Sequence, residues 1–174
     1  EVDLPQCTNA VLRANKKDYE EGQIFMQTEI EQTYRIPIQP VKELQIEVKK
    51  FKLNNNQLQG PLPLANDEQA TITIRYPSKK FESFAIHRKE DKTPLKFLAK
   101  AQFDYDVEVY LADEENIKGG FLGNWSVNPA ELRLGNKAII NVIEQEFTDD
   151  DEAYLFYADL PELSKKLPDF EITR

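Results

Sequence analysis

The feature that most constrains this chain is a long stretch in which apolar and polar residues alternate. From Leu95 to Leu111 all nine odd-numbered residues are apolar, while most even-numbered ones are charged or amide side chains. Successive side chains of a β-strand point to opposite faces of the sheet, whereas a helix would scatter these two sets around its circumference. The stretch is longer than the usual strand of about five or six residues. We therefore expect two strands, with a break near residues 99–102.

Shorter segments with the same alternation predict further strands. Leu44, Ile46 and Val48 share one parity, but Phe51 and Leu53 fall on the other, and this one-residue slip predicts a β-bulge. Turn residues separate the segments, as expected for antiparallel strands joined by short connections. The sequence therefore predicts an all-β, mostly antiparallel β-sandwich of about eight to ten strands, with a closed β-barrel as the alternative. Further strands are expected at 24–36, 72–76, 84–86, 139–147 and 154–158.

Helix is predicted only as short turns. Candidates are residues 8–16, 129–132 and 161–167, and the last two begin with a proline, which suits a first helical position. The length of 174 residues fits one domain covering residues 1–174, and 40% hydrophobic residues with ten Phe and seven Tyr indicate a packed core. One domain with little helix is the simplest interpretation.

The net charge narrows the range of partners. Acidic residues outnumber basic ones, which gives a formal charge of −9. This field repels nucleic acid and anionic lipid, and it favours a cationic partner, a protein or a divalent metal. The sequence has no apolar run of the roughly 18 residues that a transmembrane helix needs, so no transmembrane segment is expected.

The cysteine content and the first residue bear on disulfide bonding and on location. Cys7 is the only cysteine, so an intramolecular disulfide is impossible. The sequence opens on Glu1, and an initiator Met is seldom trimmed before so large a residue. We therefore expect either a cleaved signal peptide or an engineered end of the chain, and of the two we favour export to an extracytoplasmic location, periplasmic or secreted.

The residue types needed for common catalytic sites are missing. His87 is the only histidine, and no Gly-x-Ser-x-Gly motif or glycine-rich phosphate loop is present. Asp104, Asp106 and Glu108 alternate with apolar residues, which is typical of the solvated face of a strand rather than a carboxylate pair for glycoside hydrolysis. We predict that the chain is not an enzyme and needs no cofactor, calcium excepted.

Two acidic clusters are candidates for binding calcium, which takes six to eight oxygen ligands from flexible loops. They are residues 113–116 and 149–152, and each follows a predicted strand. Neither matches the EF-hand pattern, and the competing interpretation is that both are solvated turns. The candidate ligands are Asp113, Glu115, Asp149 and Asp151.

One stretch carries a family resemblance. Val107–Asp113, followed by Gly119–Gly123 and Trp125–Val127, resembles part of the calcium- and lipid-binding domains of synaptotagmin and protein kinase C. In that family a strand leads into an acidic loop, a Phe-Leu-Gly turn and a short strand. The resemblance covers residues 107–132 and implies a sandwich that binds calcium and lipid. The family's pair of aspartates is incomplete here, because Ala112 and Glu114 flank Asp113.

Three functional classes remain. The favoured one is a non-catalytic binding or assembly module, exported, that recognises a partner protein through loops or a strand edge. The alternatives are a small-ligand-binding β-barrel and the calcium- or lipid-binding sandwich. Gly123-Asn124-Trp125 matches the Gly-x-Trp of lipocalins and avidins, but those families carry it on their first strand, so Trp125 is expected in the core. Candidate contact residues are Tyr105, Tyr110, Tyr154, Tyr157 and the proline-containing segment Gly60–Leu64.

Overall fold

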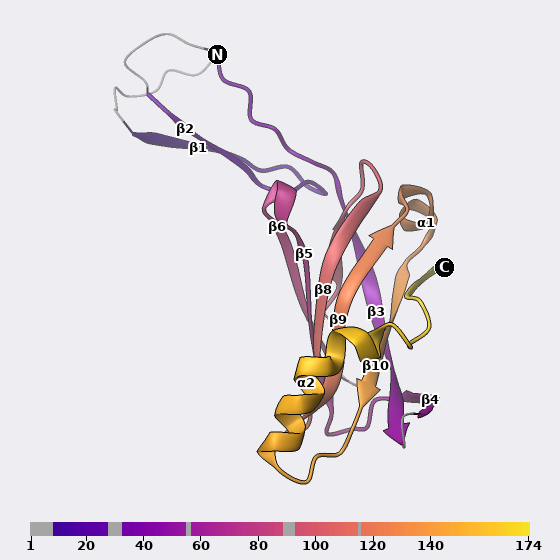
Figure 1. Cartoon of the computed structure of the whole chain (residues 1–174). Coiled ribbons are helices and arrows are strands. Elements are labelled where there is room, and N and C mark those ends of the chain that lie inside the picture. Colours follow the sequence, from indigo (N-terminus) through magenta and orange to yellow (C-terminus); the bar gives the residue numbers. More distant parts are fainter. Residues whose placement is uncertain (1–8, 28–32, 55–56, 89–92, 115) are drawn as a thin grey trace.

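The computed structural model describes residues 9–27, 33–54, 57–88, 93–114 and 116–174. It has a curled β-sheet with two helices, from which a two-stranded arm projects (Figure 1). The elements in chain order are β1 (Ala10–Ala14), β2 (Gly22–Met26), β3 (Val41–Asn54), β4 (Gln57–Pro63), β5 (Gln69–Tyr76), a 3₁₀ turn (Pro77–Lys79), β6 (Phe81–Arg88), β7 (Leu95–Leu98), β8 (Phe103–Ala112), β9 (Ile117–Val127), α1 (Pro129–Leu134), β10 (Lys137–Glu144), α2 (Asp150–Ser164) and β11 (Glu171–Thr173).

The main sheet has nine strands, with the order β4-β3-β10-β9-β8-β5-β6, while β7 pairs with β3 and β11 pairs with β10. The β3–β10 pair is parallel, and the other pairs of the described residues are antiparallel. The all-β, mostly antiparallel class is therefore confirmed. The sheet is continuous and curls into a half-barrel, an arrangement between the two-sheet sandwich and the closed barrel.

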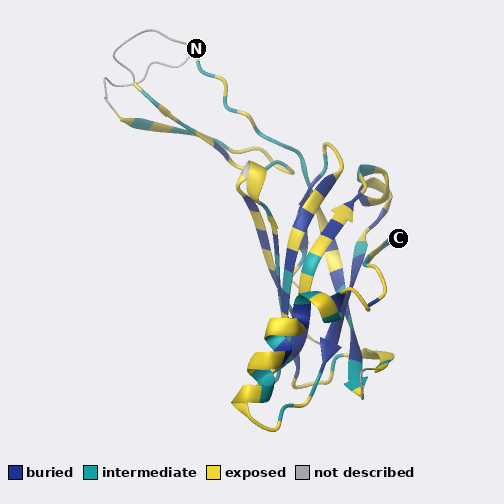
Figure 2. Cartoon of the chain, viewed as in Figure 1, coloured by how far each residue is buried: buried dark blue, intermediate teal, exposed yellow. Residues whose placement is uncertain are grey.

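The curl brings the two ends of the sheet together around a packed interior. Strand β7 pairs with the first part of β3 and also lies beside β6, where the Lys96 N–H donates to the Ser83 hydroxyl at 2.8 Å. The concave face carries the core, in which Leu44, Phe97 and Tyr105 are fully buried (Figure 2). The Leu98 N–H donates to the Tyr105 hydroxyl at 2.9 Å, so even this polar atom is satisfied. Side chains therefore fill the interior.

Several details of the sequence prediction are confirmed. The long alternating stretch is divided into β7 and β8, and the break at 99–102 falls where it was expected. The pairing of β3 with β4 shifts register between Lys50 and Lys52, which is the predicted bulge. Residues 129–132 form the first turns of α1, with the Asn128 side chain accepting the Ala130 N–H. Trp125 is buried, as expected.

Other details are wrong. Residues 154–158 lie inside α2 and not in a strand, and Pro161 lies within this helix rather than at its start. The helix forms because Phe156, Leu160 and Ser164 recur at intervals of four residues and bury one face against the sheet. The helical turn expected at 8–16 is wrong, because β1 occupies Ala10–Ala14, and residue 8 lies outside the described part. The strand expected at 24–36 is limited to β2, and residues 28–32 also lie outside the described part.

Strand β9 changes neighbours along its length. It pairs with β8 from end to end but with β10 only at Gly119 and Gly120. A Cβ atom at Gly120 would lie 2.0 Å from the Val109 carbonyl oxygen, and one at Gly119 would lie 2.0 Å from that of Ile143. Only glycine fits this close approach of three strands. Beyond it β9 and β10 diverge, and β11 takes the place beside residues 137–139 of β10.

The arm is a hairpin of β1 and β2 that joins the body near Tyr19 and Pro40, which form an isolated β-bridge. The Val41 N–H donates to the Asp18 carbonyl at 2.9 Å at the same junction. Val11 lies opposite Phe25 on the arm, and Phe25 is 77% exposed. Among the described residues no helix is long and apolar enough to cross a membrane.

Candidate functional site

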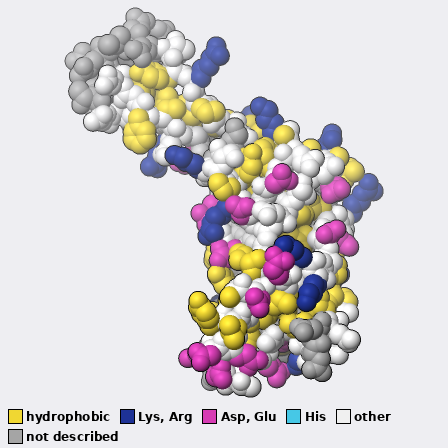
Figure 3. All heavy atoms as spheres, viewed as in Figure 1, with side chains coloured by type: hydrophobic (Ala, Val, Ile, Leu, Met, Phe, Trp, Pro, Cys, Tyr) yellow, Lys and Arg dark blue, Asp and Glu magenta, His cyan; other side chains and the backbone are white. Residues whose placement is uncertain are grey.

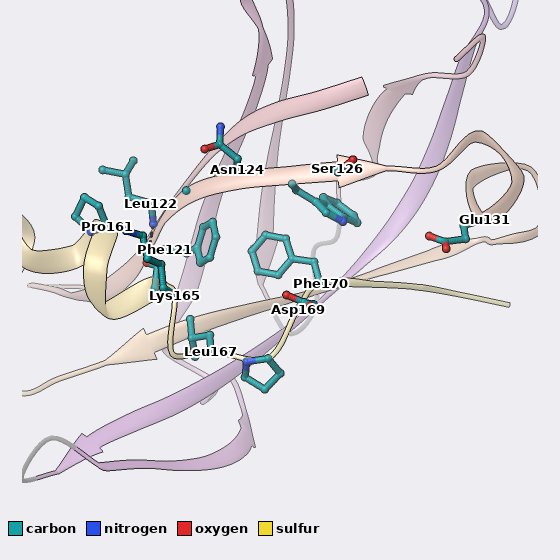
Figure 4. Close-up of a pocket in the computed structure, with 14 residues that line it drawn as sticks. Phe121, Leu122, Asn124, Ser126, Glu131, Pro161, Lys165, Leu167, Asp169 and Phe170 are labelled. Carbon is teal, nitrogen blue, oxygen red and sulfur yellow. Dashed lines mark hydrogen bonds between the residues drawn. The ribbon is translucent and has the colours of Figure 1, made fainter. Parts of the chain in front are cut away.

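A cavity of 720 Å³ opens where β9 leaves β10 (Figure 4). Residues of β9 form one wall, the C-terminal end of α2 and the segment 165–170 form the opposite one, and α1 contributes at one end. The close-up shows Glu131 at that end of the cavity and Pro161 and Lys165 at the other, with Phe170 between them. Segments far apart in the sequence therefore meet at this point. The lining residues are 121–126, 131, 161, 164, 165 and 167–170.

The wall formed by β9 is an open strand edge. In an antiparallel pair the N–H and C=O of one residue point to the same side, and this side alternates along the strand. The Leu122 N–H points away from β8, because it donates to the Ser164 hydroxyl at 3.1 Å. Asn124 and Ser126 share its parity, so their backbone groups also face the cavity. Within the described residues, the N–H groups of Asn124 and Ser126 have no protein partner.

Aromatic rings form the floor of the cavity. Phe121 and Trp125 lie on the inner face of β9, with Gly123 between them. The Phe170 ring lies across this gap, with its centroid 4.5 Å from that of Phe121 and 5.4 Å from that of Trp125. Phe97 supports Trp125 from the core at 5.3 Å. Since aromatic contacts of this kind fix ring positions, the floor is rigid and apolar.

The opposite wall is held in place by a buried side chain. Asn141 on β10 is 4% exposed, and its amide donates to the carbonyl oxygens of Pro168 and Asp169 at 3.0 and 3.1 Å. Leu167 is buried next to this turn. These contacts fix the segment that carries Phe170, so the cavity is formed before a ligand arrives.

Two carboxylates at the cavity, those of Glu131 and Asp169, lack an ion-pair partner among the residues that the structure describes. Glu131 is supplied by α1 and Asp169 by the turn after α2. The one lysine of the lining, Lys165, lies 2.5 Å from the Glu162 carboxylate on the same helix. In the described part of the chain, neither Glu131 nor Asp169 forms an ion pair. The electrostatic character of the cavity is therefore negative.

A second polar cluster lies inside the sheet and was not predicted. The Lys50 ammonium lies 2.7 Å from Glu68 and 3.0 Å from Glu144, and the Glu68 carboxylate also accepts the Ala65 N–H at 2.6 Å. Lys50, Glu68 and Glu144 are 8%, 2% and 8% exposed. This burial leaves no access for a substrate, so the cluster joins β3, β10 and the turn before β5 as a structural ion-pair network. The sequence signal was a lysine at an inward-facing position of a strand.

The four predicted calcium ligands have different surroundings. Asp113 lies 2.8 Å from the Lys118 ammonium and accepts the Asn116 N–H at 2.7 Å. Asp149 caps α2 by accepting the Glu152 N–H at 2.8 Å, and Asp151 lies in the first turn of this helix. Glu115 lies outside the described residues. Among those that are described, no group of three or more His, Cys, Asp or Glu side chains is placed to hold a metal ion.

The predicted contact residues are also dispersed. Tyr105 belongs to the core, Tyr157 is half-buried, and Tyr110 and Tyr154 are exposed. Residues 60–63 are exposed in β4, the terminal strand of the sheet. Of the two predicted locations, a loop or a sheet edge, the structure has the edge. Figure 3 shows acidic side chains gathered where α2 begins, at the end of the molecule far from the arm. None of these predicted contact residues lines the cavity beside β9.

Comparisons with known proteins give no family for the chain. No protein-family model matches it, and no similar protein was found among curated proteins or solved structures. The resemblance of residues 107–132 to calcium- and lipid-binding domains therefore has no support beyond those residues. The function is inferred from the geometry of the site.

Proposed function

We propose that this chain is a non-catalytic binding module that accepts an extended segment of a partner protein at the free edge of β9. The observation that carries the proposal is the pair of unpartnered backbone N–H groups, at Asn124 and Ser126, on the wall of a preformed cavity of 720 Å³. An extended peptide that joins a sheet edge gains backbone hydrogen bonds, and neighbouring pockets select its side chains.

The other edges of the main sheet suit this role less well. Strand β4 carries Pro61 and Pro63, which have no N–H to donate and so make a poor template for another strand. Strand β6 is partly covered by the chain around β7, where the Thr93 N–H donates to the Ile86 carbonyl at 3.2 Å. The edge of β9 keeps its donors and has a cavity beside it.

The dimensions fit a short extended segment. Strands rise about 3.4 Å per residue, so the edge from Leu122 to Ser126 spans roughly 14 Å. This length matches about five residues of an added strand. Each new backbone hydrogen bond contributes about 0.5–1.5 kcal/mol. Burial of a side chain on the aromatic floor contributes about 1.5–3 kcal/mol more.

The chemistry of the lining supports a binding role rather than catalysis. The Ser164 hydroxyl is engaged by the Leu122 N–H, and His87 lies on β6, away from the lining. A serine nucleophile needs a base within hydrogen-bond reach, and no histidine is among the lining residues described. Backbone donors, aromatic rings and carboxylates are groups that recognise a peptide.

The test uses peptides selected from a random library of displayed dodecamers on the immobilised protein. Their affinities are then measured by fluorescence anisotropy for the wild type and for Asn124→Pro, which removes a donor from the free edge. Asn124→Ala is the matched control, because the Asn124 side chain binds Asp106 at 2.8 Å and points away from the aromatic floor (Figure 4). We expect at least about a tenfold loss for the proline variant and wild-type affinity for the alanine variant.

Circular dichroism and a thermal melt establish that each variant is folded. Ser126→Pro is the second proline variant, placed one residue before the end of β9 and so less disruptive to the strand. If both proline variants fold and bind the selected peptides as the wild type does, peptide addition to β9 is excluded.

A further inference from the structure

We infer that the segment accepted by β9 carries an apolar side chain and, two residues away, a lysine or arginine. The inference rests on the proposed function and names the chemistry of the partner at the same site. It follows from the apolar floor, the two carboxylates without cations, and the alternation of side chains along an added strand.

The apolar position follows from the floor. Side chains of a strand on the edge of β9 alternate between the inner and outer faces of the sheet. On the inner face they meet Phe121, Trp125 and the half-buried Phe170, whose rings pack against one another. A Cβ atom at Gly123 would lie 2.9 Å from the Phe121 ring, so this ring packs directly over Gly123 and requires glycine there. An apolar side chain of the partner packs against the surface that these rings form.

The basic position follows from charge. Glu131 and Asp169 lie on the same side of β9 as Phe170, as the close-up shows (Figure 4). Lys165 is already paired with Glu162, so no lining cation of the described residues neutralises these two carboxylates. Residues two apart on a strand share a face and lie about 6.8 Å from each other. A lysine or arginine two residues from the apolar side chain therefore reaches the carboxylates.

The charge of the whole molecule acts in the same direction. The formal net charge of −9 attracts a cationic segment over a distance and speeds its encounter with the site. At the site itself, an arginine also gains a cation–π contact with an aromatic ring such as the half-buried Phe170, which a neutral side chain lacks. Acidic segments are repelled on both counts.

The test repeats the library selection on the wild type and on the double variant Glu131→Lys, Asp169→Lys. The matched control is Asp150→Lys, Asp159→Lys, which changes the net charge equally at two exposed positions of α2 outside the lining. On the wild type and the control, we expect enrichment of an apolar residue two positions from a lysine or arginine. The site variant should enrich acidic residues there, and its affinity for the basic peptides should fall at least about tenfold, against less than about threefold for the control.

The outcomes separate the two proposals. Peptides that lose affinity in Asn124→Pro but carry no basic residue, and that bind the site variant unchanged, would overturn the inference and leave the binding of an extended segment intact. An equal loss in the site and control variants would also overturn it, since long-range attraction would then account for the preference. Recovery of no peptide sensitive to Asn124→Pro would overturn both proposals.

Discussion

Lys50 occupies an inward-facing position of β3, in the same parity as Leu44, Ile46 and Val48. A charge at such a position loses its hydration, and the loss is tolerated only when partners are close. Glu68 and Glu144 supply them at 2.7 and 3.0 Å. The charges of the cluster are thus compensated by side chains from three separate parts of the chain. Removal of the lysine would leave two buried carboxylates facing each other.

We predict that Lys50→Met lowers the free energy of unfolding by about 3–5 kcal/mol, because methionine keeps the volume but leaves the carboxylates uncompensated. Urea denaturation at neutral pH measures this. Lys96→Met is the control, since Lys96 lies 3.5 Å from Glu43 with both side chains more than half exposed, and it should cost less than about 1 kcal/mol. A loss below about 1 kcal/mol for Lys50→Met would show that the network is not a stabilising contact.

Several buried side chains, among them Tyr105, Tyr157 and Lys50, hold their protons more tightly than in the unfolded chain. Burial raises the pKa of the Tyr157 hydroxyl to about 12, and burial also raises the pKa of Tyr105. Burial by itself lowers the pKa of Lys50, but the hydrogen bonds and charges of Glu68 and Glu144 outweigh this effect and raise it. A group whose folded pKa is raised stabilises the fold fully below its unfolded pKa.

Stability should therefore fall as the pH rises above about 10, where the unfolded tyrosines and lysines begin to lose their protons. The decline continues until the folded groups titrate, near pH 12 for Tyr157. Urea denaturation between pH 8 and 11.5, roughly the window set by these values, measures the slope. Tyr157→Phe removes one of the groups and should flatten the slope, while an unchanged slope would show that Tyr157 titrates alike in both states.

Helix α2 shows how capping residues position an element. Asp149 accepts the Glu152 N–H at 2.8 Å, and the Glu152 carboxylate accepts the Thr148 N–H at 2.9 Å. Asp149 is therefore the N-cap, and Glu152 reaches back to the residue before it, a variant of the capping box that fixes the first turn of the helix. The helix in turn carries Ser164, whose hydroxyl meets β9 at the cavity.

We predict that Asp149→Ala lowers the free energy of unfolding by about 1 kcal/mol through loss of the cap, which is a few degrees in the melting midpoint. Asp150→Ala removes a neighbouring acid that makes no cap and should cost only a few tenths of a kcal/mol. Both effects should be the same with millimolar calcium and with chelator. A calcium-dependent rise of the wild-type midpoint that Asp149→Ala abolishes would instead identify Asp149 as a ligand.

Local patterns predicted the strands well and the helix poorly, for a physical reason. The parity of Leu95–Leu111 and the slip after Val48 are properties of single strands, and the structure has both. The run 154–158 is short and apolar. It is helical because Asp149 caps the start of α2 and because Leu160 is buried near the end of the helix at Lys165. The Asp-x-x-Glu of the capping box was the available signal.

Local sequence patterns of this kind could not predict the candidate site. Its free edge exists because β9 separates from β10 after Gly120, and its walls come from α1, α2 and the C-terminal segment. The alternation of apolar and polar residues within one strand does not reveal which distant strand it pairs with. Trp125 was noticed in the sequence as a core aromatic, but its neighbour Phe170 is 45 residues away along the chain.

At the scale of the whole molecule, the arm and the body contribute differently to stability. All buried apolar residues of the core that are described lie at or after Leu44. The junction with the arm consists of backbone contacts near Tyr19, Pro40 and Val41. The C-terminal segment, by contrast, buries Leu167 in the core and places Phe170 on the cavity floor. The body therefore depends on its C-terminus and not on the arm.

We predict that a chain without residues 1–38 keeps a cooperative unfolding transition, with a free energy of unfolding within about 1 kcal/mol of the full chain, because the described residues of this range contribute no buried apolar side chain to the core. It should also bind the selected peptides with unchanged affinity. A chain without residues 166–174 loses Leu167 and Phe170, which should cost more than about 3 kcal/mol and abolish peptide binding. Urea denaturation and anisotropy on both truncations measure these effects. Loss of peptide binding in the first truncation, with its fold intact, would move the binding surface from β9 to the arm.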